Sequence, residues 1–418
     1  MKHRHSFSAT LLATLCIASC TTDQKPSEKA AQSPPPLPQL PNPENGPAYT
    51  AAAHKPQYGL DLFLHLAKQE QNNLCLSPCS SSMALALVRP GAKGETLRQI
   101  DRTIGSINQL NQQTHNTSLP LEIANRAYTS SHISLKPEYK TGLPKGSVTP
   151  IDFAANPAQA STDINQWVSD QTKGRITQLL TPQDITPLTS LILINTVYTR
   201  AKWQHPFLPK NTIEQDFRLE TGRTVPCSMM NDTYDVRYIA RPDCEIVAIP
   251  FQQHLDKKEA CMIAILPKKG ISIGKYLSSL TPAALQNIRS SLAKEHPQTV
   301  QIDIPKFKTA YDSDLAGGLA ATGMSHAFNP DRADFSGISG TPLCIASVKQ
   351  NTWFEMKEEG VEATAATAIG MDVASFGPPV PRKLPPHFKA DRPFIWIIAD
   401  LDPETTPYFI GILRDPTS

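Results

Sequence analysis

The stretch with the strongest chemical signature is Gly270-Ile-Ser-Ile-Gly274, which has the spacing of a nucleophile elbow. In an elbow, a sharp strand-to-helix turn exposes a serine hydroxyl for activation by a histidine and a carboxylate. The apolar segment ACMIAIL precedes this stretch, but a Pro-Lys-Lys segment intervenes. The candidate partners of Ser272, His296 and Asp303, also follow in an unusual order. A turn that begins a helix is the simpler interpretation, and a serine hydrolase is a remote alternative.

Other catalytic or metal-binding patterns are not found in the sequence. There is no H-E-x-x-H, Walker or G-x-G-x-x-G motif, and the 11 histidines are scattered. Cys75 and Cys79 have no second pair of ligands at metal-binding spacing. We therefore expect no metal and no cofactor. The 40 Lys and Arg balance 38 Asp and Glu without a basic run, so no nucleic-acid partner is expected.

The first 19 residues resemble an export signal. A basic start, MKHRH, precedes the apolar run FSATLLATLCIAS and Cys20. The last residues before Cys20 resemble a bacterial lipobox, in which cleavage exposes a cysteine that receives lipid. We expect residues 1–19 to be a signal peptide and Cys20 to anchor an exported protein in the cell envelope, at the outer membrane or cell surface. An ordinary signal peptide is the alternative.

Residues 20–53 are rich in proline and polar residues, which predicts a tether without a packed core. Folded character begins near Tyr58, and we expect one domain over residues 54–418. Six cysteines remain in that domain, and both buried free thiols and disulfides are open interpretations. They are Cys75, Cys79, Cys227, Cys244, Cys261 and Cys344.

The elements that would position functional residues mix helices and strands without βαβ regularity, which indicates an α+β fold. Apolar periodicity predicts helices over 59–69, 78–88 and 161–172. The same reasoning predicts strands over 74–77, 190–203, 245–251, 259–267, 300–308, 393–400 and 407–415. Residues 190–203 are almost continuously apolar, as expected for a central strand covered on both faces. The last two strands form a predicted terminal hairpin.

A tract of small residues, Gly360–Gly370, lies near the C-terminus and precedes two proline-rich clusters. Successive side chains of a strand alternate between its faces. One face of this tract would be uncharged, with Val361, Ala363, Ala365, Thr367 and Ile369. The other face would carry Glu362, the only charge. Such a segment could slide between two strands without burying a charge, but the pattern alone leaves a linker and an insertable strand as equal alternatives.

From about Tyr58 to Pro416 the chain resembles the serpins. LSPCSSSMALALV, INQWVSDQTKGRI and LILINTVYTRAKWQHPF match the family's early core helix, the helix that crosses the main sheet and the central strand. IPKFK, FNPDRADFSGIS, EMKEEGVEATAATA and FKADRPFIWII follow in the family's order and spacing. The resemblance implies a large mixed central sheet, two further sheets, about eight or nine helices and an exposed reactive loop at about 358–386.

By that resemblance the protein is a suicide inhibitor and not an enzyme. A target protease cleaves the loop, forms an acyl-enzyme and is carried across the molecule as the loop inserts into the main sheet. The resemblance implies a monomer that forms a covalent complex with a serine protease, and a cysteine protease is a second target class. The alternative is a non-inhibitory serpin that binds partners or is simply cleaved.

The resemblance also assigns roles within the reactive loop. The hinge comprises Glu358, Glu359, Gly360, Val361, Glu362, Ala363, Thr364, Ala365, Ala366 and Thr367, whose small residues are typical of inhibitory members. The usual loop length places the reactive bond at Ala374–Ser375, where a small residue favours an elastase-like protease. The long segment that follows leaves alternatives at Met371, Val373, Phe376 and Arg382.

Five further positions match the region where the main sheet of serpins opens. They are Ser77, Ser80, Asn195, Trp203 and Gln350. Gln350 stands where the family usually has histidine; its amide can donate and accept hydrogen bonds but does not titrate near neutral pH. Trp203 matches the aromatic residue at the top of the sheet, where the loop first inserts.

Overall fold

The computed structural model describes residues 58–253, 257–361 and 384–418. The expected signal peptide, tether and most of the reactive loop lie outside these ranges. The described residues include nine α-helices, in agreement with the predicted number. They are α1 (Tyr58–Ala67), α2 (Pro78–Ala86), α3 (Gly94–Ile104), α4 (Ile107–Asn116), α5 (Pro137–Thr141), α6 (Pro157–Gln171), α7 (Ile273–Ser279), α8 (Pro282–Lys294) and α9 (Ala316–Ala321).

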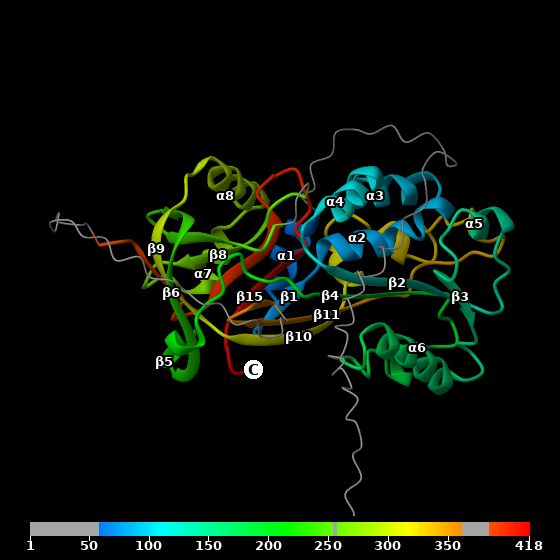
Figure 1. Ribbon diagram of the computed structural model, residues 1–418. Helices are drawn as coiled ribbons and strands as arrows, with labels where there is room; N and C mark the ends of the chain where they lie inside the picture. Colours follow the sequence, from blue (N-terminus) through cyan, green and yellow to red (C-terminus); the bar gives the residue numbers. More distant parts are fainter. Residues whose placement is uncertain (1–57, 254–256, 362–383) are drawn as a thin grey trace, which may run out of the picture. The chain divides into compact units, whose positions relative to one another are not determined.

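The main sheet contains six strands and is mixed, as predicted. Its strands in spatial order are β10 (Phe307–Asp314), β11 (Ser347–Lys357), β4 (Leu191–Thr199), β2 (Leu121–Ser130) and β3 (Val148–Ile151), and β12 (Gly360–Val361) pairs with β11. Strand β4 pairs in parallel with β11 and antiparallel with β2. In Figure 1, α2, α3 and α4 lie on one side of this sheet and α6 lies on the other. Every residue of β4 is consequently buried, as its apolar run predicted.

Two further sheets share the long strand β6 (Thr224–Ala240). The C-terminal end of β6 continues into a sheet with β7 (Cys244–Pro250), β8 (Ala260–Pro267), β14 (Phe394–Asp400), β15 (Phe409–Leu413) and β1 (Leu74–Leu76). The rest of β6 pairs with β5 (Ile213–Arg218) and β9 (Gln298–Pro305), and β13 (His387–Lys389) pairs with β9. Strands β14 and β15 form the predicted antiparallel hairpin. The α+β architecture predicted from the sequence is confirmed.

The segment over 300–308, predicted as one strand, belongs to two sheets. Strand β9 ends at Pro305 and pairs with β6, whereas β10 begins at Phe307 and pairs with β11. Pro305 has no N–H to continue a ladder, and the N–H of Lys306 donates to the carbonyl of Ser228 at 2.8 Å. The chain therefore leaves one sheet at this proline and enters the next.

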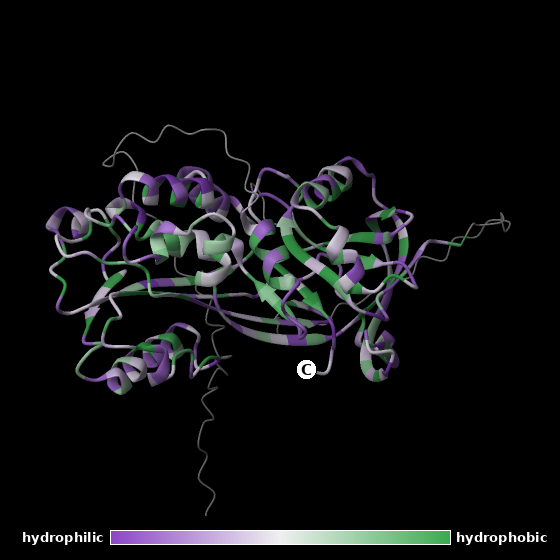
Figure 2. Ribbon diagram, turned by 180° about the vertical axis from the view of Figure 1, so that it is seen from behind, coloured by the Kyte–Doolittle hydropathy of each residue, from purple (hydrophilic) through white to green (hydrophobic). Residues whose placement is uncertain are grey.

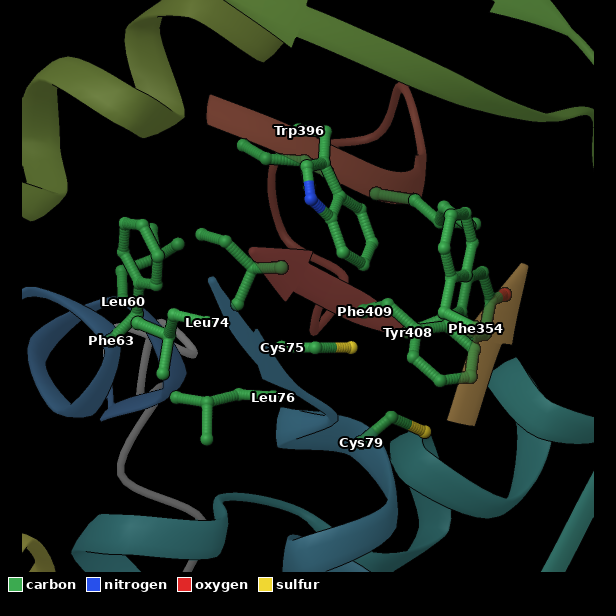
Figure 3. Packing of buried hydrophobic residues seen from close by; sticks show 14 of the residues in the cluster. Leu60, Phe63, Leu74, Cys75, Leu76, Cys79, Phe354, Trp396, Tyr408 and Phe409 are labelled. Carbon is green, nitrogen blue, oxygen red and sulfur yellow. The ribbon is translucent and has the colours of Figure 1, made fainter. Parts of the chain in front are cut away.

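The largest hydrophobic core joins the main sheet to the C-terminal hairpin. Phe354 of β11 stacks on Trp396 of β14 with ring centroids 4.4 Å apart, and Phe409 of β15 lies beside it (Figure 3). A second apolar cluster lies between α6 and the main sheet, where Ile164 and Val168 pack with residues of β4 such as Ile194. Figure 2 shows green residues concentrated on the central strands and purple residues on the outer helices. The main sheet is therefore covered by apolar packing on both faces.

All six cysteines of the described ranges are free, and only Cys344 is not buried. Burial raises the pKa of Cys75 and Cys261 to about 12, which disfavours reactive thiolates. The free-thiol interpretation agrees with this arrangement. Among the described residues, no helix is both long and apolar enough to span a bilayer.

Candidate functional site

The boundary between β4 and β11, here called the seam, is closed at one end of the main sheet. At the other end it is occupied by another segment. Strands β4 and β11 pair directly from Ile192 and Ser347 to Val197 and Thr352. Beyond this pairing, β11 bonds to β12, with Lys357 opposite Gly360. The other edge of β12 bonds to the chain that follows β4. There, the N–H of Val361 donates to the carbonyl of Ala201 at 2.6 Å, and Gly360 bridges Lys202. Gly360 and Val361 therefore already lie between the two sides of the seam.

Gly360 is required by the close approach of this segment to the chain after β4. Its φ of +139° is disfavoured for residues with a side chain. A Cβ at this position would lie only 2.1 Å from the carbonyl oxygen of Ala201. The structure thus gives a physical reason for glycine at the position that the sequence assigned to the hinge.

Glu358 fixes the turn before Gly360. Its backbone carbonyl accepts from the N–H of Phe207 at 2.9 Å. Its buried carboxylate lies 2.9 Å from the ammonium of Lys306 and accepts from the hydroxyl of Thr212 at 2.9 Å. Burial alone would raise the pKa of Glu358, but Lys306, the backbone N–H of Glu358 and Thr212 together hold that pKa below its usual range. The loop therefore begins at a glutamate whose carboxylate is ionised and held in place.

Trp203 lies at the same end of the seam and is fully buried. Its indole N–H donates to the carbonyl of Lys357 at 3.0 Å, and its backbone N–H donates to the carbonyl of Glu359 at 3.0 Å. The ring stacks on Phe251 with centroids 4.6 Å apart. The residue that sequence reasoning placed at the top of the sheet thus holds both ends of the turn.

The other four predicted sheet-opening residues meet in one buried network farther down the seam. Gln350 donates to Asn195 Oδ1 at 2.7 Å and to the carbonyl of Ser77 at 3.0 Å, and its own oxygen accepts from the N–H of Ser77 at 2.9 Å. Asn195 Nδ2 donates to the carbonyl of Ser80 at 3.2 Å and to the hydroxyl of Ser80. Gln350 therefore satisfies partners on both the neighbouring strand and the helix beneath.

Sequence reasoning missed two members of this network. Asn125 of β2 lies opposite Asn195 in the sheet register and accepts from its amide at 2.5 Å. The carbonyl of Tyr408 accepts from the hydroxyl of Ser77 at 2.6 Å. No local motif marks Asn125 or Tyr408, because tertiary pairing alone brings them to the seam.

Ser272 lies at the start of a helix, as the simpler interpretation predicted. It is the N-cap of α7, and its hydroxyl accepts from the N–H of Lys275 at 3.2 Å. The carboxylate of Asp303 pairs with His387 at 3.1 Å, and not with His296 as a triad would require. This arrangement gives no support to the hydrolase alternative.

The remaining assignments lie outside the described residues and stay predictions. They are the lipidated Cys20, the hinge residues Glu362, Ala363, Thr364, Ala365, Ala366 and Thr367, the reactive bond Ala374–Ser375, and the alternatives Met371, Val373, Phe376 and Arg382.

The two central strands of the main sheet, β4 and β11, pair directly over part of their length and are parted at one end by the returning segment Gly360–Val361. The family model described as Serpin (serine protease inhibitor) matches residues 53–416. This chain belongs to the serpin family.

Relatives of known name agree with this assignment. The chain is 30% identical to leukocyte elastase inhibitor A of Rattus norvegicus over 383 residues, covering 86% of this chain and 97% of the relative. It is 30% identical to serpin B6 of Macaca fascicularis over 361 residues, covering 82% and 93%. The thermophilic serpin tengpin in its native state superposes with a TM-score of 0.70 at 27% identity, covering 86% of this chain and 94% of tengpin.

Proposed function

We propose that this protein is a suicide-type inhibitor that traps a serine protease, preferably an elastase-like one, after cleavage at Ala374–Ser375. The names of its relatives support the class of target, because one of them is an elastase inhibitor. A small residue before the reactive bond suits a protease with a shallow pocket. Cysteine proteases are the second class of target.

The match between the small-residue tract and the seam carries this proposal. Continuing the β12 register along both sides of the seam would set Thr364 opposite Tyr198 and Trp353. The same register would set Gly370 opposite Ile192 and Ser347, where the direct pairing of β4 and β11 begins. The tract from Gly360 to Gly370 therefore has the length of the whole seam, which a linker would have no reason to match.

The two faces of the tract also suit the two faces of the sheet. Ala363 would lie opposite Phe354 and Thr199, whose side chains are fully buried. Glu362, the only charge, would lie opposite Arg200, which is exposed, and opposite Glu355, which pairs with Lys357 at 2.9 Å. Insertion in this register would bury no charge in the main core.

Insertion would be strongly favourable once the loop is cut. It replaces one ladder between β4 and β11 by two ladders to a new strand, a net gain of roughly ten hydrogen bonds. At about 1 kcal/mol each, these bonds contribute on the order of 10 kcal/mol. This is comparable to the stability of a whole domain, so the trapped state would not revert.

Incubation of the purified protein with elastase-like, chymotrypsin-like, trypsin-like and papain-like proteases tests the proposal. We expect a complex with an elastase-like protease that survives boiling on a denaturing gel. The released C-terminal peptide should begin at Ser375. A start at Lys383 would keep the mechanism and move the reactive bond to Arg382. Cleavage by every protease without any complex would reject inhibition of these classes and leave a substrate-only serpin.

We also propose that Cys20 anchors the protein to a membrane of the cell envelope. The proposal is supported by the lipobox-like residues before Cys20 and by the proline-rich tether after it. Radiolabelled fatty acid should be incorporated into the wild-type chain expressed in a bacterium and not into the Cys20→Ser variant. Equal labelling of the two chains, or labelling of neither, would reject the anchor.

A further inference from the structure

Cations and aromatic rings alternate in a row across the face of the main sheet that α6 covers. Lys173 lies 5.7 Å from the ring centroid of Tyr198, and Arg175 lies 4.8 Å from the same ring. Arg175 also lies 5.5 Å from the ring of Trp353, and Lys308 lies 5.6 Å from that ring. All four distances are within the range of cation–π attraction.

Arg175 is the member of this row that touches both sides of the seam. Tyr198 belongs to β4 and Trp353 to β11. The direct backbone pairing of these strands ends at Val197 and Thr352, one residue before the two rings. The guanidinium of Arg175 therefore connects β4 to β11 at the point where their hydrogen bonds stop.

The segment that carries Arg175 is held firmly at the end of α6. Lys173 and Gly174 both adopt positive φ, at 54° and 77°. The N–H of Gly174 donates to the carbonyl of Ser169 at 2.8 Å, a bond that closes the helix end. Arg175 donates from its backbone N–H and its Nη1 to the carbonyl of Thr172, at 3.1 and 3.2 Å. These bonds limit how far the guanidinium can move with either ring if the rings separate.

The contacts of the neighbouring cation Lys173 lie on the β2 side of the seam. Lys173 and Arg200 both pair with Glu122 of β2, and Lys173 lies 3.0 Å from its carboxylate. Their contacts with Tyr198 therefore join β4 to β2, on the side away from β11. Lys173 offers a matched comparison, because it has the same charge as Arg175 and contacts the same ring, Tyr198, but within the described part of the chain it contacts only the β4 side of the seam.

We propose that Arg175 is a positioning residue that holds β4 and β11 together and limits how often the seam opens. A strand that enters a sheet moves its neighbours from about 4.8 Å to about twice that distance. Arg175 can then keep only one of its two rings, and the opening loses one cation–π contact. Such a contact corresponds to about a two- to fivefold change in an equilibrium. Any effect on inhibition rests on the proposed function, but the opening of the seam does not.

Hydrogen exchange of the uncleaved protein, followed by mass spectrometry, tests this role without protease or loop cleavage. Exchange of amides in 191–199 and 347–357 reports opening of the seam, and β14 and β15 report the rest of the molecule. We expect Arg175→Ala to speed exchange of the seam about two- to fivefold and to leave β14 and β15 unchanged. Arg175→Lys should restore part of the protection, and Lys173→Ala should behave as the wild type.

A double mutant separates the bridge from a local loosening of the turn after α6. If Arg175 acts through Trp353, Arg175→Ala combined with Trp353→Leu should exchange no faster than the faster single variant. The proposal would be overturned if the effects of the two single variants on the exchange rate multiplied in the double variant. It would also be overturned if Arg175→Ala left exchange of the seam unchanged or sped exchange throughout the molecule. A protein that forms no protease complex yet shows the expected exchange pattern would reject the proposed inhibition and keep the role of Arg175.

Discussion

Gln350 of β11 and Asn195 of β4 are direct partners across the seam, and the Gln350 amide donates to Asn195 Oδ1 at 2.7 Å. Any strand that enters between β4 and β11 must break this bond. In the proposed register Thr367 would then lie opposite both residues. The same network therefore stabilises the closed seam and lies in the path of insertion. The network has no group that titrates near neutral pH, because Gln350 stands where serpins usually have histidine.

Replacing Gln350 by alanine should destabilise the uncleaved protein. The change leaves the N–H of Ser77 and the Oδ1 of Asn195 without the partner that each has in Gln350. Buried groups that lose their partners cost about 1–3 kcal/mol each, so we expect a lower urea midpoint for Gln350→Ala. Gln112→Ala, at an exposed position of α4, is the control and should not shift the midpoint. Equal midpoints for both variants would contradict a stabilising network.

Substitution of Gly360 by alanine should displace the segment that already occupies the top of the seam. The new Cβ would collide with the carbonyl of Ala201, and the positive φ adds about 1–3 kcal/mol of strain. We expect a lower thermal midpoint and, under the proposed function, more cleaved inhibitor per complex on gels. Gly340→Ala is the matched control, because a Cβ there meets nothing within 4 Å. A wild-type ratio of complex to cleaved protein in Gly360→Ala would show that this close approach is not needed.

The site could be predicted from the sequence only where a motif or a resemblance marked its residues. Ser77, Asn195 and Gln350 were predicted to lie near one another, and the structure places them together. Asn125 joins them only because β2 and β4 pair in one register, and register depends on the whole sheet. Lys306 likewise reaches Glu358 because the chain changes sheets after Pro305, where the sequence suggested an unbroken strand.

The contribution of Glu358 to the free energy of unfolding should be lost at acid pH. Its pKa lies below the usual value near 4.3, so its contribution is present above that value and is lost as pH falls through the lower folded pKa. Glu358→Gln removes charge-assisted bonds worth about 1.5–3 kcal/mol and should lower the urea midpoint at pH 7. The two midpoints should converge as the pH falls below the folded pKa of Glu358. A constant gap between them would contradict ionisation as the cause, and Glu295→Gln at an exposed position is the control.

Asp400 should have the opposite pH dependence. It is buried at the end of β14, and burial raises its pKa to about 6, although Tyr408 donates to its carboxylate at 3.0 Å. Stability from this group is present below the unfolded pKa near 3.9 and is lost as pH rises through about 6. Wild type should therefore weaken relative to Asp400→Asn between pH 4.5 and 7.5, by about 2 kcal/mol. Urea midpoints at the two pH values measure the change, and a pH-independent difference would contradict it.

Moving the single charge of the small-residue tract by one position should separate inhibition from cleavage. In the proposed register Glu362 would lie on the exposed face beside Arg200, whereas Ala363 would face the buried Phe354 and Thr199. The double substitution Glu362→Ala and Ala363→Glu keeps the composition of the loop but turns the carboxylate into the core. Burial of an unpaired charge costs several kcal/mol, and every 1.4 kcal/mol changes a ratio about tenfold. The exchanged variant should therefore be cleaved as fast as the wild type, but the amount of stable complex that it forms should be at least about tenfold lower.

Glu362→Ala alone is the control and should still trap protease. Undiminished complex formation by the exchanged variant would show that the tract does not enter the seam in this register, and loss of complex in both variants would assign the effect to Glu362 itself.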